Sequence, residues 1–254
     1  MATTTRLMEE MTWPEVAEAA KANKPVVIAL GSTEQHGPHL PLNTDVLIPV
    51  AIANEASKQL DLVIAPPIHF GAMSRPLSGG GETFPGTLSM RAQTLITTLH
   101  EVLAGLARAG FRRVCLQNWH YENAAYIWEA CDLTAARHPD VRMLILENPF
   151  PEFTDADLAA VFPNGFPGWD VEHASIIETS LMYVIRPDLV RRDKIADDQA
   201  ERHPAWDVVP PPKQFIPKSG VLWHPTEASE AIGRKVLGMC ANHLVKALRT
   251  EFEL

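Results

Sequence analysis

The stretch GSTEQHGPHLPLNTD, residues 31–45, follows a short apolar run, PVVIAL at 25–30, and leads into a helix-like pattern. It predicts a strand-to-helix loop crowded with potential metal ligands, and open α/β proteins place their chemistry in such loops. Glu34 and His36 are two residues apart, so in extended backbone their side chains point the same way and can bind one ion. Asp45 can complete this set, although aspartate at a helix start is also a common N-cap.

Outward from this loop, short apolar strands alternate with helical patterns. We expect strands at 25–30, 62–65, 113–118 and 141–146, and helices at 14–22, 46–60, 91–109 and 124–137. This alternation predicts an α/β fold, in which a parallel sheet is covered by helices on both faces and its strands are joined by right-handed crossovers. No linker divides the chain, so residues 1–254 are expected to form a single domain.

The remainder of the chain is less regular. Further helices are expected at 155–161, 171–185 and 226–254, the last capped by Thr226. The segment SGGGETFPGT at 78–87 is too rich in Gly and Pro for regular structure, and the long loop around it predicts a functional site or an interface. Residues 186–225 are proline-rich in part and predict an extended surface excursion or a subunit contact.

Composition limits the classes of function. Of 254 residues, 46% are hydrophobic and 21% are charged, as in an ordinary soluble enzyme. A formal net charge of -9 without a Lys/Arg cluster argues against nucleic-acid binding. No apolar run reaches the roughly 18 residues that a membrane span needs, and the three scattered cysteines predict buried thiols in a reducing compartment. We therefore expect a cytoplasmic protein.

A second polar pair mirrors the first. His120-x-Glu122 stands directly after the expected strand at 113–118, as Glu34-x-His36 stands after the first strand. Because the carboxyl ends of parallel strands meet at one edge of a sheet, these side chains can converge. With the aspartate of the first loop as a bridge, three carboxylates and two imidazoles suit two divalent ions, Zn²⁺ or Mn²⁺. Two such ions typically lie about 3.5–4 Å apart and activate a shared water.

Each of these residues also has a structural interpretation. A histidine can be a hydrogen-bonded residue of the core, and glutamates in loops can simply be solvated. The coincidence of three polar clusters at strand ends or helix starts favours a metal site, although short metal motifs also arise by chance. Outside the ligand set, we expect structural roles for three loop histidines and orienting roles for two glutamates: His39, His69 and His224, and Glu82 and Glu178.

Four motifs, in this order, resemble the creatininase (creatinine amidohydrolase) family. They are GSTEQHGPH at 31–39 with NTD at 43–45, SGGGETFPGT at 78–87, NWHYEN at 118–123, and GFPGWDVEH at 165–173 with ETS at 178–180. The similarity runs from about residue 12 to the C-terminal helix, so it covers nearly the whole chain.

The resemblance implies a three-layer α/β/α sandwich with a mostly parallel central sheet, assembled as a homohexamer, that hydrolyses C–N bonds at a binuclear Zn²⁺/Mn²⁺ centre. Carried over by motif, one ion would be held by Glu34, Asp45 and His120, and the other by His36, Asp45 and Glu122. The implied catalytic residues are Glu122 and His173, the latter exchanging a proton as the ring opens. The implied substrate pocket comprises Ser78, Tyr121, Trp169, Asp170 and His173.

One pocket residue and one lid position need separate treatment. Taken alone, Trp169 predicts packing of an irregular loop rather than catalysis. In creatininase, a tryptophan on the mobile loop after the fourth strand closes over the substrate, and the aligned place here holds Pro149, with Phe150 the nearest aromatic residue. We therefore expect a lid of different stiffness and shape, and creatinine as a poorer substrate than for creatininase itself.

The leading hypothesis from the sequence is a binuclear metal-dependent amidohydrolase that opens a small cyclic amide, creatinine or a close analogue. Relatives of creatininase also hydrolyse a formamide on a nucleotide precursor or a peptide bond in a cofactor precursor, so these substrates stay open. A scaffold whose metals are purely structural is the alternative outside enzymes. Metal content measured together with turnover separates these hypotheses.

Overall fold

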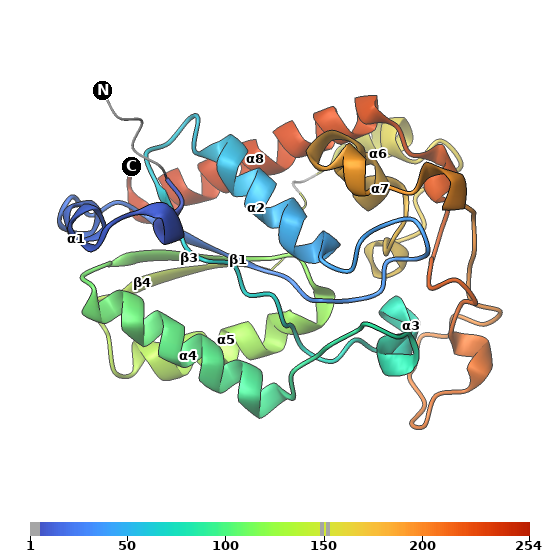
Figure 1. The fold of residues 1–254 in the computed structure, drawn as a ribbon, viewed down its shortest axis with the longest axis horizontal. Coiled ribbons are helices and arrows are strands. Elements are labelled where there is room, and N and C mark those ends of the chain that lie inside the picture. Colours follow the sequence, from blue (N-terminus) through green and yellow to red (C-terminus); the bar gives the residue numbers. More distant parts are fainter. Residues whose placement is uncertain (1–5, 148–149, 151–152) are drawn as a thin grey trace.

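The computed structural model describes residues 6–147, 150 and 153–254 and is built on a sheet of four parallel strands (Figure 1). In chain order, the strands are β1 (Val26–Leu30), β2 (Val63–Ile64), β3 (Arg113–Asn118) and β4 (Arg142–Leu146). They lie in the order β2-β1-β3-β4, and every neighbouring pair is parallel. The expected α/β class is therefore confirmed.

Helices cover both faces of this sheet (Figure 1). One face carries α2 (Thr44–Ala56), α7 (Ile176–Ile185) and α8 (Glu230–Phe252). The other carries α4 (Ala92–Arg108) and α5 (Ala124–Ala135). The shorter helices are α1 (Trp13–Lys21), α3 (Pro76–Gly79) and α6 (Asp155–Val161). The three-layer α/β/α arrangement expected from the sequence is confirmed.

Strand β1 separates two hydrophobic cores. All of its residues are buried, and successive side chains point to opposite faces. Val27 belongs to the core that contains Ile48 of α2 and Leu244 of α8, whereas Val26 and Ile28 belong to the core under α4 and α5. A strand buried on both faces requires a continuous apolar run rather than an alternating one, and VVIAL supplies it.

The start predicted for the C-terminal helix is wrong. Helix α8 begins after Ser229, whose hydroxyl accepts a hydrogen bond from the N–H of Ile232 at 3.2 Å. Thr226, the expected cap, instead donates its hydroxyl to Asp197 at 2.7 Å. The Thr226 side chain is therefore bound to a residue distant in sequence and does not cap the helix.

Two other local expectations are also corrected. The helix expected from 171 begins only at Ile176, because Ala174 adopts a left-handed φ of 51° that a helix cannot continue through. The Gly-rich segment at 78–87 is less irregular than expected, since α3 runs into it and a 3₁₀ turn follows at Gly81–Thr83.

The loops after β1 and β3 start side by side. Leu30 and Asn118, the last residues of these strands, are paired in register. Gly31 follows directly, and a Cβ at this position would overlap the main-chain carbonyl group of Asp45 in α2. Glycine is therefore required for the close approach that brings the start of α2 over the end of β1.

Replacing Gly31 by alanine is expected to lower the free energy of unfolding by about 1–3 kcal/mol, because the added methyl pushes α2 away from β1. Gly238→Ala is the matched control, because a Cβ at this position in α8 meets open space. This substitution should raise the free energy of unfolding by about 0.5–1 kcal/mol, since alanine favours a helix over glycine. Urea unfolding of both variants checks this. An unchanged unfolding free energy for Gly31→Ala would contradict the close approach.

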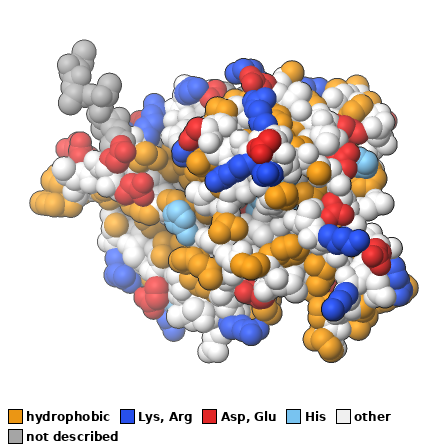
Figure 2. Space-filling model, turned by 45° about the vertical axis from the view of Figure 1, so that its right-hand side comes forward, with side chains coloured by type: hydrophobic (Ala, Val, Ile, Leu, Met, Phe, Trp, Pro, Cys, Tyr) orange, Lys and Arg blue, Asp and Glu red, His pale blue; other side chains and the backbone are white. Residues whose placement is uncertain are grey.

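The surface carries hydrophobic as well as charged side chains. On the face shown in Figure 2, hydrophobic patches lie around the centre between Lys, Arg, Asp and Glu side chains. Trp206 and Val209, in the excursion at 186–225, are exposed. Because scattered exposed apolar residues are common on monomers too, the expected homohexamer stays a prediction. Within the part of the chain that the structure describes, no helix is both long and apolar enough to cross a membrane.

Candidate metal centre

Three side chains from three separate segments converge at the carboxyl edge of the sheet. Glu34 lies in the loop after β1, Asp45 in the first turn of α2, and His120 directly after β3. The Nδ1 atom of His120 lies 3.1 Å from Oε2 of Glu34 and 3.2 Å from Oδ2 of Asp45. One candidate ligand atom of each residue lies within 4.8 Å of the others. The structure thus brings together the set expected for the first ion.

The set expected for the second ion is brought together in part. The Nε2 atom of His36 lies 2.9 Å from Oδ1 of Asp45. Its second carboxylate neighbour is Glu178 of α7, whose Oε2 is 3.5 Å away. Each oxygen of Asp45 therefore faces one imidazole, which is the arrangement of a bridging carboxylate.

Glu122, the expected third member of the second set, lies next to this cluster and contacts His120, a member of the first set. Its Oε1 accepts hydrogen bonds from the Arg75 main-chain N–H at 3.1 Å and from the Ser78 hydroxyl. Its Oε2 lies 3.5 Å from Nε2 of His120. Ser78, expected in the substrate pocket, thus holds a carboxylate of the candidate centre.

The orientation of both histidines suits ligation. The Nδ1 of His36 lies 3.0 Å from the carbonyl oxygen of Glu34, and Nε2 of His120 lies 3.0 Å from that of Ala72. A carbonyl can only accept, so each of these nitrogens carries a proton and donates it. The remaining nitrogens, Nε2 of His36 and Nδ1 of His120, face the carboxylates, as in metal sites whose histidines are fixed by a second hydrogen bond.

One buried oxygen supports a cation at this place. Oε1 of Glu34 is buried and has no hydrogen-bond partner among the described residues. An unsatisfied buried acceptor is costly, and a divalent ion among Glu34, Asp45 and His120 would satisfy it. Carboxylate oxygen and imidazole nitrogen are ligand types that both Zn²⁺ and Mn²⁺ accept. The residues present therefore fit the expected ions.

The buried carboxylates of the centre favour the protonated forms of two histidines. Burial alone would lower the pKa of His36, but the charges of Asp45 and Glu178 and hydrogen bonds to both raise it well above its usual value. Burial alone would also lower the pKa of His120, but the charge of Glu34 and hydrogen bonds to Asp45 and Glu34 raise it well above its usual value. Any cation that binds these rings must displace a proton from each, so its affinity falls with acidity.

Asp45 does not cap α2. Asn43 holds the N-cap position, and Asp45 lies in the first turn with its carboxylate buried against the two histidines. Burial would raise the pKa of Asp45, but the charge of His36 and hydrogen bonds from both histidines lower it. The carboxylate is thus ionised, as ion binding requires.

The expected pocket residues surround the same place. A cavity of about 40 Å³ opens over the centre, and its lining includes Ser78, Tyr121, Trp169, Asp170 and His173 together with Glu34, Asp45, His120 and Glu122. Trp169 stacks on Phe150, with ring centroids 4.3 Å apart and planes at 13°. Pro149, the expected lid position, lies outside the described residues.

His173 is held in one tautomer. The side-chain amide of Gln35 donates its two protons to the carbonyl oxygens of Gly79 at 2.7 Å and Gly220 at 3.0 Å. No proton is then left for Nε2 of His173, which lies 2.9 Å from both the side-chain nitrogen and the main-chain oxygen of Gln35. Nε2 of His173 therefore carries the proton and donates it to that oxygen. Nδ1 is left to exchange a proton.

Sequence reasoning missed two residues that position this centre. Gln35 fixes His173, and Trp119 donates its Nε1–H to Oε1 of Glu178 at 2.9 Å. Gln35 lies between Glu34 and His36 in the sequence, and Trp119 directly precedes His120. This position next to a candidate ligand is the sequence feature that could have identified both residues. Glu178 itself was expected to orient a histidine, and it contacts His36.

The remaining candidates lie apart from the centre or are bound elsewhere. His39 contacts the Thr179 hydroxyl at 2.9 Å, and His224 contacts Asp197 at 3.1 Å. His69 and Glu82 are exposed. The contacts of His39 and His224 agree with structural roles, whereas the exposure of His69 and Glu82 supports neither the structural role expected for His69 nor the orienting role expected for Glu82. The three cysteines are buried and free.

Comparisons with known proteins point the same way as the motifs. A sequence profile described as "Creatininase: Creatinine amidohydrolase" matches residues 9–248. The chain is 36% identical over 251 residues to the creatinine amidohydrolase of Pseudomonas putida, and 96% of each protein is covered. It is 30% identical over 227 residues to a mycofactocin precursor peptide peptidase of Mycolicibacterium smegmatis, and this match covers 85% of this chain and 81% of the relative.

Solved structures agree with this similarity. A Zn–Zn form of a creatininase mutant and a Mn form of creatininase each match with a TM-score of 0.93 and 33% identity, over 98% of this chain and 99% of theirs. The loops that carry the candidate ligands thus stand on a fold shared with enzymes that have been obtained with these two metals.

Proposed function

Because the chain belongs to the creatininase family of amidohydrolases, we propose that it is a binuclear metal-dependent hydrolase that opens a small cyclic amide, creatinine or a close analogue, at a C–N bond. The proposal includes two divalent ions, Zn²⁺ or Mn²⁺, as cofactors. It also includes a cytoplasmic homohexamer, for which family resemblance and composition are the support.

A single observation carries the proposal. Both carboxylate oxygens of Asp45 face imidazoles, Nε2 of His36 at 2.9 Å and Nδ1 of His120 at 3.2 Å, while Oε1 of Glu34 is buried without a partner. An unpartnered buried carboxylate oxygen is costly, and a bound cation would relieve that cost. Asp45 would hold two ions together with His36 and His120, and Glu34 would contribute a further ligand.

The protein's own groups have separable tasks. The ions, once bound, supply Lewis acidity and an activated water. Nδ1 of His173 carries no proton while Nε2 donates to Gln35, so it would accept the proton that the attacking water releases and pass it to the departing amide nitrogen. Trp169, which lines the cavity and stacks on Phe150, would shield the reacting bond from bulk water. Tyr121 and Asp170 line the same cavity and orient the ring.

A second candidate reaction is hydrolysis of a peptide bond in a cofactor precursor. The observation that favours it is the 30% identity to a mycofactocin precursor peptide peptidase over most of both proteins. Peptide and lactam hydrolysis share the attack on an amide carbonyl, so the same residues can serve either. The two substrates differ in the groups attached to the amide: a small ring in a lactam, and a peptide chain on both sides of the bond in a precursor peptide.

The experiment that tests the proposal combines metal analysis with turnover. Protein purified without chelator is analysed for metal and assayed with creatinine, related cyclic amides, formamides and peptides, in defined Zn²⁺ and Mn²⁺. We expect about two ions per chain and hydrolysis of at least one cyclic amide. Two bound ions without hydrolysis of any amide would favour the non-catalytic scaffold, and hydrolysis of peptides alone would favour the second candidate.

A further inference from the structure

A second, larger cleft adjoins the candidate metal centre, and we propose that it binds a flat aromatic substituent of the substrate amide that carries no negative charge. This inference rests on the proposed function and narrows its substrate class. The substrate would be a substituted amide rather than a bare ring such as creatinine.

The two hollows lie side by side and share part of their walls. The cleft has a volume of about 590 Å³, against about 40 Å³ for the cavity over the centre. Both are lined by Trp119, Tyr121, Glu122 and Trp169, so a molecule with its amide at the centre can extend into the cleft. Pockets of roughly 300–1,000 Å³ hold ligands of drug size. A single five-membered ring would leave most of this cleft unfilled.

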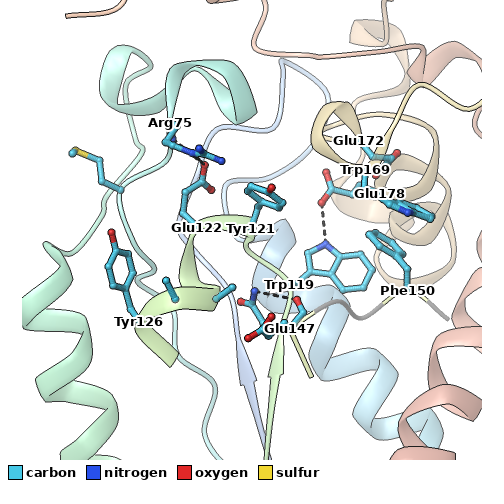
Figure 3. A pocket seen from close by; sticks show the side chains of 14 residues that line it. Arg75, Trp119, Tyr121, Glu122, Tyr126, Glu147, Phe150, Trp169, Glu172 and Glu178 are labelled. Carbon is cyan, nitrogen blue, oxygen red and sulfur yellow. Dashed lines mark hydrogen bonds and ion pairs between the residues drawn. The ribbon is translucent and has the colours of Figure 1, made fainter. Parts of the chain in front are cut away.

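The walls of the cleft are aromatic. Figure 3 shows Trp119, Phe150 and Trp169 on one side and Tyr126 on the other. Tyr121, between them, is 57% exposed, and Met73 at the rim is 41% exposed. A flat apolar group that packs on these partly exposed aromatic and thioether side chains removes apolar surface of both partners from water.

The charge of the cleft argues against an anionic substituent. Arg75 is the one cationic side chain among the described lining residues. Its Nε lies 3.5 Å from Glu122 and its Nη1 3.2 Å from Asp207, so its charge is balanced within the protein. Glu172 and Glu178 lie at the end that the cleft shares with the metal centre. Glu147 is an exposed acidic side chain that lines the cleft but not the cavity over the centre, so the part farther from the centre disfavours an anion.

Small residues at the start of α5 make room for the substituent. Ala124 and Ala125 line the cleft, and Ala125 is exposed, so a larger side chain there fills the cleft without disturbing the core. Ala135, at the other end of the same helix, is also exposed but does not line the cleft. Ala125→Phe and Ala135→Phe are thus a matched test and control.

The probes are hydantoin and 5-benzylhydantoin, two cyclic amides that differ by one benzyl group. Rapid-mixing tryptophan fluorescence of the metal-loaded protein measures binding before turnover, with Trp119 and Trp169 as reporters. We expect the benzyl compound to bind about tenfold or more tightly than hydantoin, because its ring is removed from water. Ala125→Phe should abolish most of that preference and leave hydantoin binding within about twofold, and Ala135→Phe should change neither. Met73→Ala, which removes part of the wall without a clash, should weaken the preference.

Two results would overturn the inference: equal binding of both hydantoins by the unmodified protein, or an equal loss for both in Ala125→Phe. Hydrolysis is followed separately in the same samples. A binding preference without hydrolysis would count against the proposed reaction on these rings but not against the cleft. Hydrolysis of hydantoin without any preference for the benzyl compound would support the proposed reaction and contradict the proposed role of the cleft.

Discussion

Replacing Asp45 by alanine is expected to remove at least one divalent ion per chain and to lower turnover about a thousandfold or more, since metal catalysis supplies several kcal/mol and each roughly 1.4 kcal/mol is tenfold. Asp45 is the residue whose two oxygens face both imidazoles, at 2.9 Å from His36 and 3.2 Å from His120. Its loss therefore affects both proposed ion positions. Metal analysis after gel filtration, together with turnover of a cyclic amide, measures the effect.

Two further variants make the result interpretable. Asp45→Asn keeps the shape and one carbonyl oxygen, so it should retain more metal than Asp45→Ala but less than the unmodified protein. Asp188→Ala removes an exposed aspartate that is paired with Arg186 at 2.6 Å, and it should change neither metal content nor turnover. Full metal content and full activity in Asp45→Ala would show that the centre proposed here does not exist.

The convergence of the candidate ligands could be predicted from the sequence because it follows from topology. Once 25–30 and 113–118 are parallel neighbours, their carboxyl ends coincide, and Leu30 does pair with Asn118. Glu34 and His120 then start from adjacent points. The run at 25–30 is short and continuously apolar, and the run at 113–118 has an apolar centre; such runs are typical of strands in a parallel sheet.

The parts that the sequence did not reveal depend on contacts between distant segments. The sequence predicts an orienting role for Glu178 but not which histidine it contacts, because its place beside His36 depends on two hydrogen bonds. The N–H of Ala174 donates to its Oε2 at 2.7 Å, and Nε1–H of Trp119 donates to its Oε1. The left-handed φ of Ala174, which delays the start of α7, has no signal in an alanine. The cap of α8 was misplaced because Asp197 engages Thr226 from 29 residues away. Local propensity cannot report such partners.

Replacing His173 by asparagine is expected to lower kcat about 10²–10⁴-fold while both ions stay bound, because general acid–base catalysis contributes that much. The structural reason is the fixed tautomer: Nε2 of His173 donates to the main-chain oxygen of Gln35 at 2.9 Å, which leaves Nδ1 as the proton-exchanging atom. Metal analysis and kcat are measured on the same preparation.

The control for this variant is His69→Asn, the same substitution at an exposed loop histidine, which should leave kcat and metal content unchanged. A His173→Asn protein that loses its ions would indicate that the ring acts as a ligand, in line with its position near Glu34 and His36. A kcat within about threefold of the unmodified enzyme, with both ions retained, would exclude His173 as the proton carrier. The departing nitrogen would then have to take its proton from another group of the cavity. Tyr121 and Asp170, which share the lining with His173, would be the next residues to replace.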